Sequence, residues 1–447
     1  MRRTTRGGRG GSVTRDFSRR DFLRIGGAGL AGAALLGAVG CGGGGSGGNN
    51  ITFSMGPDDT GVLPDLIEKF NQQNGGKFKV VLRVAPSDTG QYFDQLNTQF
   101  QAGGGDVDVI GSDVIWPAQL AANGYILDLT DRFTDQDEFL PGPMQSNTFE
   151  GKAWGVPWYT DGGLLYYRQD LLDEAGYSAP PKTWEELIEQ AQKVQQDADI
   201  KFGFVFQGAE YEGGVCNGCE YIWTHGGDIL DPEDPSKVII DSPETAAGLA
   251  TWRSMIESGL ATRGVLQYTE TESAASFTDG DSVFLRNWPY AYAIVSDPKI
   301  SNIKPDQVGV APIPVGEGQS QSYSTLGGWN FSINAASDKQ DEAWEFIQWM
   351  TAPEQLKTHA LDASRLPTRQ SLYEDQEILD KVPVAKLGKE VIIDNTRPRP
   401  VSPVYSDMSL ELAKQFNASL AGEVPPDQAV SMLQSELGRI VEQGQQI

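Results

Sequence analysis

Apolar and polar positions after residue 50 repeat with two alternating periods, that of a strand and that of a helix. Alternating or continuous apolar runs, which predict strands, occupy residues 51–55, 78–84 and 106–110. A 3.6-residue pattern, which predicts helices, occupies residues 61–74, 91–101 and 116–123. This order indicates a mostly parallel α/β sheet, in which ligands bind beyond the carboxyl ends of the strands. Asp59 and Asp113 follow two of the predicted strands.

The same alternation returns further along the chain. Thr183 and Glu186 form a predicted capping box for a helix that runs to about residue 196. Ser242-Pro243-Glu244 opens a second helix, which runs to about residue 258. The other predicted elements are strands at 202–207 and 308–312 and a helix at 338–350. Because an aromatic-rich segment separates the two α/β patterns, we predict two lobes.

Three short segments combine Trp with Gly, Pro, Asn or Asp, at residues 154–163, 287–290 and 325–330. This composition predicts loops. Such segments suit a sugar, because a pyranose has an apolar C–H face for an indole ring and a rim of hydroxyls that needs donors and acceptors. Trp is also a common core residue, and packing is the simpler interpretation for the four on predicted helices: Trp184, Trp252, Trp344 and Trp349.

The N-terminal segment has the features of an export signal. Residues 18–24 are similar to a twin-arginine motif, and a short apolar run follows at 25–39. The run leads into Ala38-Val39-Gly40-Cys41, which resembles a lipobox. We therefore predict a twin-arginine lipoprotein signal at 1–41 with a lipid on Cys41, and a flexible glycine-rich tether at 42–50. An uncleaved signal anchor is the alternative; with the lipid, the protein would stand at the outer face of the cytoplasmic membrane, on its extracellular or periplasmic side.

The charge of the chain narrows the range of partners. Without its first forty residues, which hold eight Arg and two Asp, the chain has a formal net charge of −32. Such an acidic surface repels phosphate backbones, so nucleic acid is not expected as a partner. The two His residues, His225 and His359, each lack a second His nearby, and we predict no metal site and no cofactor.

Cys216 and Cys219 have the spacing of a C-x-x-C motif. A zinc site would need two further ligands, of which His225 supplies only one. A redox dithiol would stand at the start of a helix in a thioredoxin-like unit, which is not apparent in this sequence. In an exported protein, the simplest interpretation is a structural disulfide between the two residues that holds the Asn217-Gly218 turn.

Five segments occur in one order along the chain: 105–110 with Asp113, 151–157, 163–167, 277–288 and 327–329. Together they resemble the extracellular solute-binding proteins of family 1, of the maltose- and trehalose-binding type. The resemblance implies an α/β, two-lobed, periplasmic-binding-protein-like fold of type II, with a ligand cleft between lobes that a hinge joins. It also implies a monomeric substrate-binding component of an ABC importer, with permease and ATPase subunits as partners. Tyr167 departs from the commonest family pattern, which has Asn there.

The resemblance further assigns lobes and site residues. Lobe one would hold residues 51–160 and about 309–365, and lobe two 161–308 and about 366–447. The residues carried over to the site are Asp59, Asp113 and Asp161 as acceptors for sugar hydroxyls, Tyr159, Trp288, Tyr290 and Trp329 as stacking or hydrogen-bonding rings, Gly327 and Gly328 as backbone partners, and Arg399 as a donor. Arg365 and Arg397 are alternatives to Arg399.

Two other functions stay open on the sequence alone. A surface-anchored carbohydrate-active enzyme would need two carboxylates beside one bond, and Asp113 and Asp161 could be such a pair, but a chain with 61 acidic residues offers many pairs. A binding protein for a non-sugar solute, such as a polyamine, is less compatible with the tryptophan-rich segments. No dinucleotide, haem or iron–sulfur motif is present. We therefore predict no catalytic residues and a sugar ligand, with trehalose or maltose as the expected disaccharide.

Overall fold

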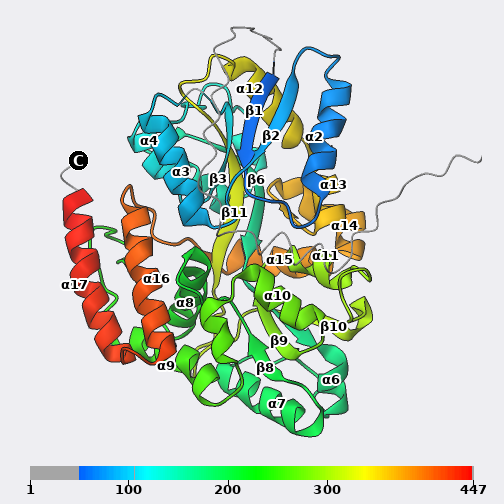
Figure 1. Cartoon of the computed structure of the whole chain (residues 1–447), viewed down its shortest axis with the longest axis vertical. Coiled ribbons are helices and arrows are strands. Elements are labelled where there is room, and N and C mark those ends of the chain that lie inside the picture. Colours follow the sequence, from blue (N-terminus) through cyan, green and yellow to red (C-terminus); the bar gives the residue numbers. More distant parts are fainter. Residues whose placement is uncertain (1–49, 105, 445–447) are drawn as a thin grey trace, which may run out of the picture. The chain divides into compact units, whose positions relative to one another are not determined.

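The computed structural model of the chain describes residues 50–104 and 106–444. The predicted signal at 1–41, the lipidated Cys41 and residues 42–49 of the predicted tether lie outside the described residues. Figure 1 follows the described chain from β1 (Asn50–Met55), in blue, to α17 (Pro426–Gly444), in red.

The first sheet has the strand order β12-β6-β11-β3-β1-β2, and β13 pairs with β11. Its strands after β1 are β2 (Lys79–Val84), β3 (Val109–Asp113), β6 (Val156–Gly162), β11 (Ser324–Ile333), β12 (Leu366–Pro367) and β13 (Thr396–Arg397). β1 is parallel to β2 and β3, whereas β11 is antiparallel to β3 and β6. The three strands predicted before residue 114 are confirmed in type, although the third begins at Val109.

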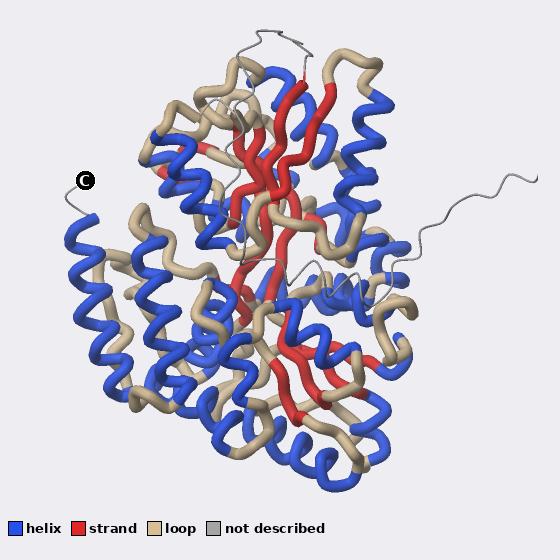
Figure 2. The backbone as a smooth tube through the Cα atoms, in the orientation of Figure 1, coloured by secondary structure: helices blue, strands red, loops and turns tan. Residues whose placement is uncertain are grey.

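The second sheet has the order β10-β7-β9-β8, and Figure 2 shows its strands as a group separate from those of the first sheet. The strands are β7 (Leu164–Arg168), β8 (Phe202–Val205), β9 (Ser282–Asn287) and β10 (Val308–Ala311). β7 is antiparallel to β9 and β10, and β8 is parallel to β9. The resemblance placed residues 309–311 in lobe one, but their backbone pairs with β7 of the second sheet. It placed residues from about 366 onward in lobe two, but β12 and β13 pair with β6 and β11 of the first sheet. A short hairpin of β4 (Thr148–Phe149) and β5 (Lys152–Ala153) stands apart.

Helices cover both sheets. They are α2 (Val62–Gln73), α3 (Thr89–Gln101), α4 (Pro117–Ala122), α5 (Pro141–Ser146), α6 (Gln169–Glu174), α7 (Trp184–Asp197), α8 (Glu212–Thr224), α9 (Pro243–Glu257), α10 (Glu270–Thr278), α11 (Ala291–Ser296), α12 (Gln340–Met350), α13 (Pro353–Ala363), α14 (Gln376–Lys381), α15 (Pro383–Asp394), α16 (Tyr405–Ala421) and α17. Four short 3₁₀ turns of the described chain join them, η1 (Gln136–Glu138), η2 (Arg263–Gln267), η3 (Pro305–Gln307) and η4 (Gln370–Glu374). α16 and α17 lie beside α8 and α9 (Figure 1).

The helix starts follow the predicted capping chemistry. The Thr183 side chain accepts a hydrogen bond from the backbone N–H of Glu186 at the start of α7. Ser242 does the same for Thr245 at the start of α9, where Pro243 occupies the first helical turn. In α2, every residue of one face is buried against the first sheet: Leu63, Leu66, Ile67 and Phe70.

Two of the three predicted loops are strands, so that prediction is wrong for residues 154–163 and 325–330, most of which lie in β6 and β11. The pairing of the two strands tolerates their Gly and Pro because it contains a bulge. Tyr159 pairs with Trp329 and Pro157 pairs with Asn330, which leaves Trp158 as an extra residue on β6. A proline without an N–H is tolerated at such a position. Residues 288–290, by contrast, do leave β9 as a turn.

The two sheets are joined where β6 gives way to β7. Gly163 is the single residue between these strands, and the Ser324 hydroxyl at the start of β11 donates to its carbonyl oxygen at 2.7 Å. A Cβ atom on Gly163 would overlap the carboxylate of Glu220. The chain therefore crosses between the sheets at a point with no room for a side chain. This point lies next to the start of β11, the strand that pairs with β6.

We expect Gly328→Ala to lower the free energy of unfolding by at least about 2 kcal/mol, because Gly328 has φ 120° and a Cβ atom there would overlap the carbonyl oxygen of Tyr159. The matched control is Gly438→Ala in the interior of α17, where a Cβ atom meets nothing within 4 Å and should stabilise the helix by about 0.5–1 kcal/mol. Urea denaturation measures both. Equal effects of the two substitutions would contradict the close approach of β6 and β11.

Candidate functional site

Most of the predicted ligand residues meet where the two sheets adjoin. Asp113 ends β3, Tyr159 and Asp161 lie on β6, and residues 327–329 lie on β11. The register places Trp329 opposite both Asp113 and Tyr159, and Gly327 opposite Asp161. Trp288 and Tyr290 come from the second sheet, in the turn that follows β9. The site is thus built from both sheets.

Arg365 lies at the centre of this group. Its guanidinium carbon is 4.7 Å from the ring centroid of Tyr159 and 4.1 Å from that of Tyr290, and its Nη1 is 3.9 Å from Asp161 Oδ2. Arg365 follows α13 through Ser364, which takes the left-handed conformation with φ 51° and ends that helix. One buried cation therefore contacts groups from both sheets.

Asp161 is buried, and one of its carboxylate oxygens, Oδ1, has no hydrogen-bond donor among the described residues. Burial raises the pKa of Asp161 to about 6, although the charge of Arg365 acts against this increase. Near neutral pH, the group is therefore an ionised acceptor without a donor, which is costly in a protein interior. A hydroxyl of a bound solute is a donor that would remove this cost.

Trp288 is fixed at its edge and at its indole nitrogen. A Cβ atom on Gly327 would lie 2.9 Å from Cζ3 of the Trp288 ring, so only glycine leaves room for the ring at this position. Trp288 Nε1 donates to Glu270 Oε1 at 3.2 Å, and the Tyr211 hydroxyl donates to the other oxygen of Glu270 at 2.7 Å. Glu270 and Tyr211 were not among the residues predicted for the site. The capping box of Thr269 with Glu272, which begins α10, is the signal that could have placed Glu270 at a helix start.

Trp329 is half-buried and packs against aromatic rings of the first sheet's helices. Its ring is stacked with Tyr92 at 6.2 Å between centroids and meets the edge of Trp116 at 5.5 Å. These contacts hold the indole in one orientation beside Asp113, its neighbour on β3.

The structure separates the three arginines that the sequence could not. Arg399 Nη2 lies 3.4 Å from Asp113 Oδ1 and 3.3 Å from the carbonyl oxygen of Leu326, and its Nη1 lies 2.5 Å from Glu212 Oε1. Arg399 is buried, and its Nε has no partner among the described residues. Arg397 instead pairs with Asp228, away from the predicted carboxylates. Of these three candidates, Arg365 and Arg399 are therefore the two that lie beside predicted site carboxylates.

Asp113 resembles Asp161 in its electrostatics. Burial raises its pKa to about 6; the charge of Arg399 acts against the increase, and the nearby Glu212 adds to it. Glu212 also accepts hydrogen bonds from the hydroxyls of Tyr405 and Ser409. Each of the two buried aspartates thus has its own arginine, and both remain acceptors near neutral pH.

Asp59 lies at the exposed edge of the group, between β1 and α2. Partial loss of water raises its pKa, which the charge of Arg365 opposes and those of Asp58 and Glu270 reinforce. Its neighbour Asp58 is occupied locally, because Asp58 Oδ2 accepts from the backbone N–H of Leu63 at 2.7 Å. Gly328 is also partly occupied: its carbonyl oxygen accepts from the backbone N–H of Val114 at 3.3 Å.

The predicted disulfide is wrong: the structure has Cys216 and Cys219 as buried free thiols. The Asn217-Gly218 pair does not form a turn but continues helix α8. Tertiary packing explains this glycine, because a Cβ atom on Gly218 would overlap the ring of Phe416 on α16. Burial raises the pKa of both thiols, so they stay protonated, neutral core groups near neutral pH.

The described residues contain no group of three or more His, Cys, Asp and Glu side chains that could hold a metal ion. None of their helices combines the length and the apolar character that a membrane crossing needs.

Comparison with known proteins decides the family. Residues 65–385 match the family described as bacterial extracellular solute-binding protein. The chain belongs to this family. The resemblance inferred from the sequence is thereby confirmed.

Individual relatives of this solute-binding protein are also binding proteins. A Deinococcus radiodurans protein named "Probable ABC transporter-binding protein" is 34% identical over 383 residues, which cover 83% of this chain and 89% of that protein. The solved structure of maltose-bound T. maritima MalE3 is 37% identical with a TM-score of 0.82, covering 87% of this chain and 98% of that one. A ribitol complex of a solute-binding protein from Agrobacterium radiobacter K84 is 27% identical with a TM-score of 0.78, covering 88% and 98%. The predicted two-lobed α/β fold class is confirmed by these structures.

The pKa of Asp161 yields a test of its burial. In the unfolded chain the carboxyl has its ordinary pKa of 3.8, whereas in the folded protein its pKa is about 6. As pH rises, the unfolded chain therefore loses this proton at a lower pH than the folded protein does. Asp161 therefore lowers the free energy of unfolding as pH rises through this window, by at most about 3 kcal/mol. We expect the free energy of unfolding of the wild type, minus that of Asp161→Asn, to fall by up to this amount between about pH 4 and pH 7. Urea denaturation at a series of pH values measures both free energies. The exposed Asp94→Asn is the control, and a pH-independent difference for Asp161→Asn would contradict the buried carboxylate.

Proposed function

We propose that this solute-binding protein captures a sugar of two rings, such as trehalose or maltose, and delivers it to the permease and ATPase subunits of an ABC importer. The observation that carries the proposal is the buried Asp161 oxygen without a donor, beside Arg365 and Trp288. A carboxylate and an arginine provide strong hydrogen bonds to hydroxyls, and an indole face accepts the apolar side of a pyranose. The site offers all three in one place.

Two groups of similar composition support a ligand with two rings. The first combines Asp161, Arg365 and Trp288. The second combines Asp113, Arg399 and Trp329. Their strand positions on β11, Gly327 and Trp329, are two residues apart, a rise of about 7 Å. Each group supplies an acceptor, a donor and an aromatic ring, so each suits one sugar ring.

Relatives support the same substrate class. The T. maritima structure with 37% identity is maltose-bound, and the Agrobacterium radiobacter structure with 27% identity contains ribitol. A linear polyol shares the hydroxyls of a sugar but has no ring face to stack on tryptophan. The two tryptophans therefore favour a sugar over a polyol as the ligand of this chain.

We also propose that binding closes two lobes about the segments that join the sheets. The lobe division follows the sheets: the first lobe carries β6, β11 and their neighbours, and the second carries β7 to β10. Gly163, residues 312–323 and residues 398–404, between β13 and α16, are the connections whose backbone would absorb the motion. The residues of the site come from both sides of these connections, so a ligand that contacts both groups would favour the closed form.

The binding proposal is tested by calorimetry of residues 50–447 with a panel of monosaccharides, disaccharides and polyols. We expect one disaccharide to bind one-to-one without product release. Trp288→Ala and Trp329→Ala should each weaken it at least about tenfold, about 1.4 kcal/mol, because each removes a stacking surface.

Trp349→Ala is the matched control, since this tryptophan packs on Phe70 and donates to Gln73, outside the site. It should leave the affinity within about twofold of that of the wild type. If only a polyol binds, the proposed ligand class is a polyol and not a sugar. Release of a monosaccharide would support the enzyme alternative, and the absence of binding to every compound would refute the proposal.

The lipid anchor is a separate proposal that rests on the resemblance of residues 38–41 to a lipobox. We expect the full-length protein to fractionate with membranes, and Cys41→Ala to move it to the soluble fraction of the cell envelope, since the lipid would be lost. Immunoblotting of fractions measures this. Replacement of Arg19 and Arg20 by Lys, which should block export instead, separates loss of the lipid from loss of transport. A Cys41→Ala protein that stays on the membrane would favour the signal-anchor alternative.

A further inference from the structure

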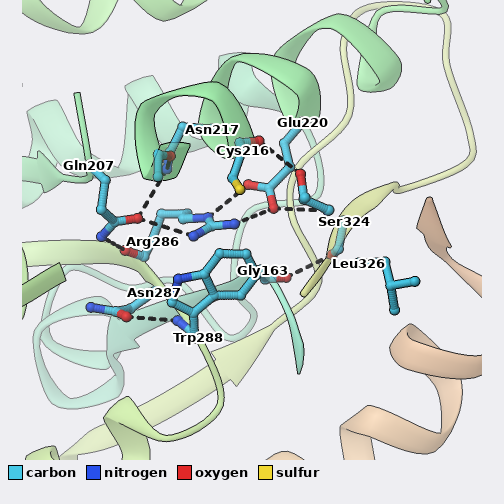
Figure 3. A network of polar contacts seen from close by, with 12 residues as sticks. Gly163, Gln207, Cys216, Asn217, Glu220, Arg286, Asn287, Trp288, Ser324 and Leu326 are labelled. Atoms are coloured by element: carbon cyan, nitrogen blue, oxygen red, sulfur yellow. Dashed lines mark hydrogen bonds and ion pairs between the residues drawn. The ribbon is translucent and has the colours of Figure 1, made fainter. Parts of the chain in front are cut away.

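A buried ion pair lies beside Trp288, with its arginine against one face of the indole ring. Arg286 Nε and Nη2 contact the two carboxylate oxygens of Glu220 at 2.8 and 2.5 Å, and both side chains are 2% exposed. The guanidinium carbon of Arg286 is 4.1 Å from the ring centroid of Trp288. Figure 3 shows the pair between helix α8, which carries Glu220, and the Trp288 ring.

The arginine is held in place by further hydrogen bonds. Its Nη1 donates to Gln207 Oε1 at 3.1 Å, and Gln207 Nε2 donates to the backbone carbonyl of Arg286 at 2.9 Å. Asn217 donates to the same oxygen of Gln207 at 3.0 Å. Because these contacts leave the guanidinium little freedom, its plane is a fixed support for one face of the indole (Figure 3).

The carboxylate of Glu220 also contacts β11 near its start, beside the point where β6 gives way to β7. Its Oε1 accepts from the backbone N–H of Thr325, on β11, at 3.1 Å. The Thr325 hydroxyl donates to the carbonyl oxygen of Cys216 at 2.9 Å, one turn earlier on α8. A side chain on Gly163 would overlap both Glu220 and Arg286. The ion pair therefore lies at the point where the chain crosses between the sheets.

We propose that the Glu220–Arg286 pair is a positioning device, which holds the Trp288 ring in its ligand-stacking orientation and ties it to the strands that join the two sheets. Three independent contacts of Trp288 agree with this role: Arg286 on one ring face, Glu270 at the indole nitrogen and Gly327 at the ring edge. Both members of the pair are 2% exposed, so in this proposal they act through Trp288 rather than by direct contact with a ligand. The proposal rests on the function proposed above.

The decisive variant is Arg286→Lys, which keeps the charge but loses the planar, two-pronged contact. The matched control is Arg369→Lys. Arg369 is also a buried arginine that lies over an aromatic ring, 4.4 Å from Phe139, and pairs with the carboxylates of Asp135 and Glu138, but it lies outside the site. We expect both variants to lower the melting temperature. Only Arg286→Lys should also lower the affinity for the disaccharide, by about tenfold or more.

A double-mutant cycle distinguishes positioning from general stability. If Arg286 acts through Trp288, then Arg286→Lys should have less than about a twofold effect on the affinity when Trp288 is already alanine. Glu220→Gln, which keeps the shape of the side chain, serves in the same cycle should Arg286→Lys not fold, with the same expected result. An equal loss in both backgrounds, or an unchanged affinity of the single variant, would overturn the proposal while leaving sugar binding intact. A wild-type protein that binds no sugar would overturn both.

Discussion

β6 and β11 pair as antiparallel strands, and the part of the site that belongs to the first sheet stands on this pair. The pair is close because Gly328 has no side chain to separate its backbone from that of Tyr159. Its register sets Asp161 beside Gly327, and Tyr159 beside Trp329. β6 ends and β11 begins next to the second sheet, and there the Ser324 hydroxyl donates to the carbonyl oxygen of Gly163 at the crossing point. Packing, site and connection between lobes therefore depend on one strand pairing.

The electrostatics of the site follow from burying two carboxylates with two arginines. An isolated buried carboxylate would take up a proton, but Arg365 and Arg399 keep the pKa of Asp161 and of Asp113 at about 6. Both acids therefore stay ionised near neutral pH and accept strong hydrogen bonds. An unpaired buried acceptor is expensive, so a ligand with correctly placed hydroxyls gains more there than it would at an exposed carboxylate. A solute that lacks these hydroxyls would leave the acceptor unpaired, which is a physical basis for selectivity.

Trp288, a predicted ligand residue of the second sheet, is supported on three sides by the surrounding framework. The ring has a buried cation under one face, a carboxylate at its nitrogen and the glycine of β11 at its edge. A stacking surface whose own supports are hydrogen-bonded loses little conformational freedom when the ligand arrives. Helix α8 belongs to this support. It contributes the carboxylate of Glu220, and its free cysteines and its glycines are packed in the core.

The sequence by itself determined the local features whose causes are local. The cap of Thr183, the proline-opened helix after Ser242, the buried face of α2 and the alternating strands all follow from residue type and spacing. The segment order also predicted the family, and most of the residues that the resemblance assigned to the site lie together where the two sheets adjoin. Only the tertiary structure decided that residues 325–330 are a strand, because the bulge at Trp158 and the pairing with β6 override the loop preference of Gly and Pro. It alone also separated Arg365 and Arg399 from Arg397, replaced the predicted disulfide by helical thiols and placed Arg286, paired with Glu220, against one face of Trp288. Each of these depends on contacts between residues tens to hundreds of positions apart, or on packing against another helix, which no local pattern records.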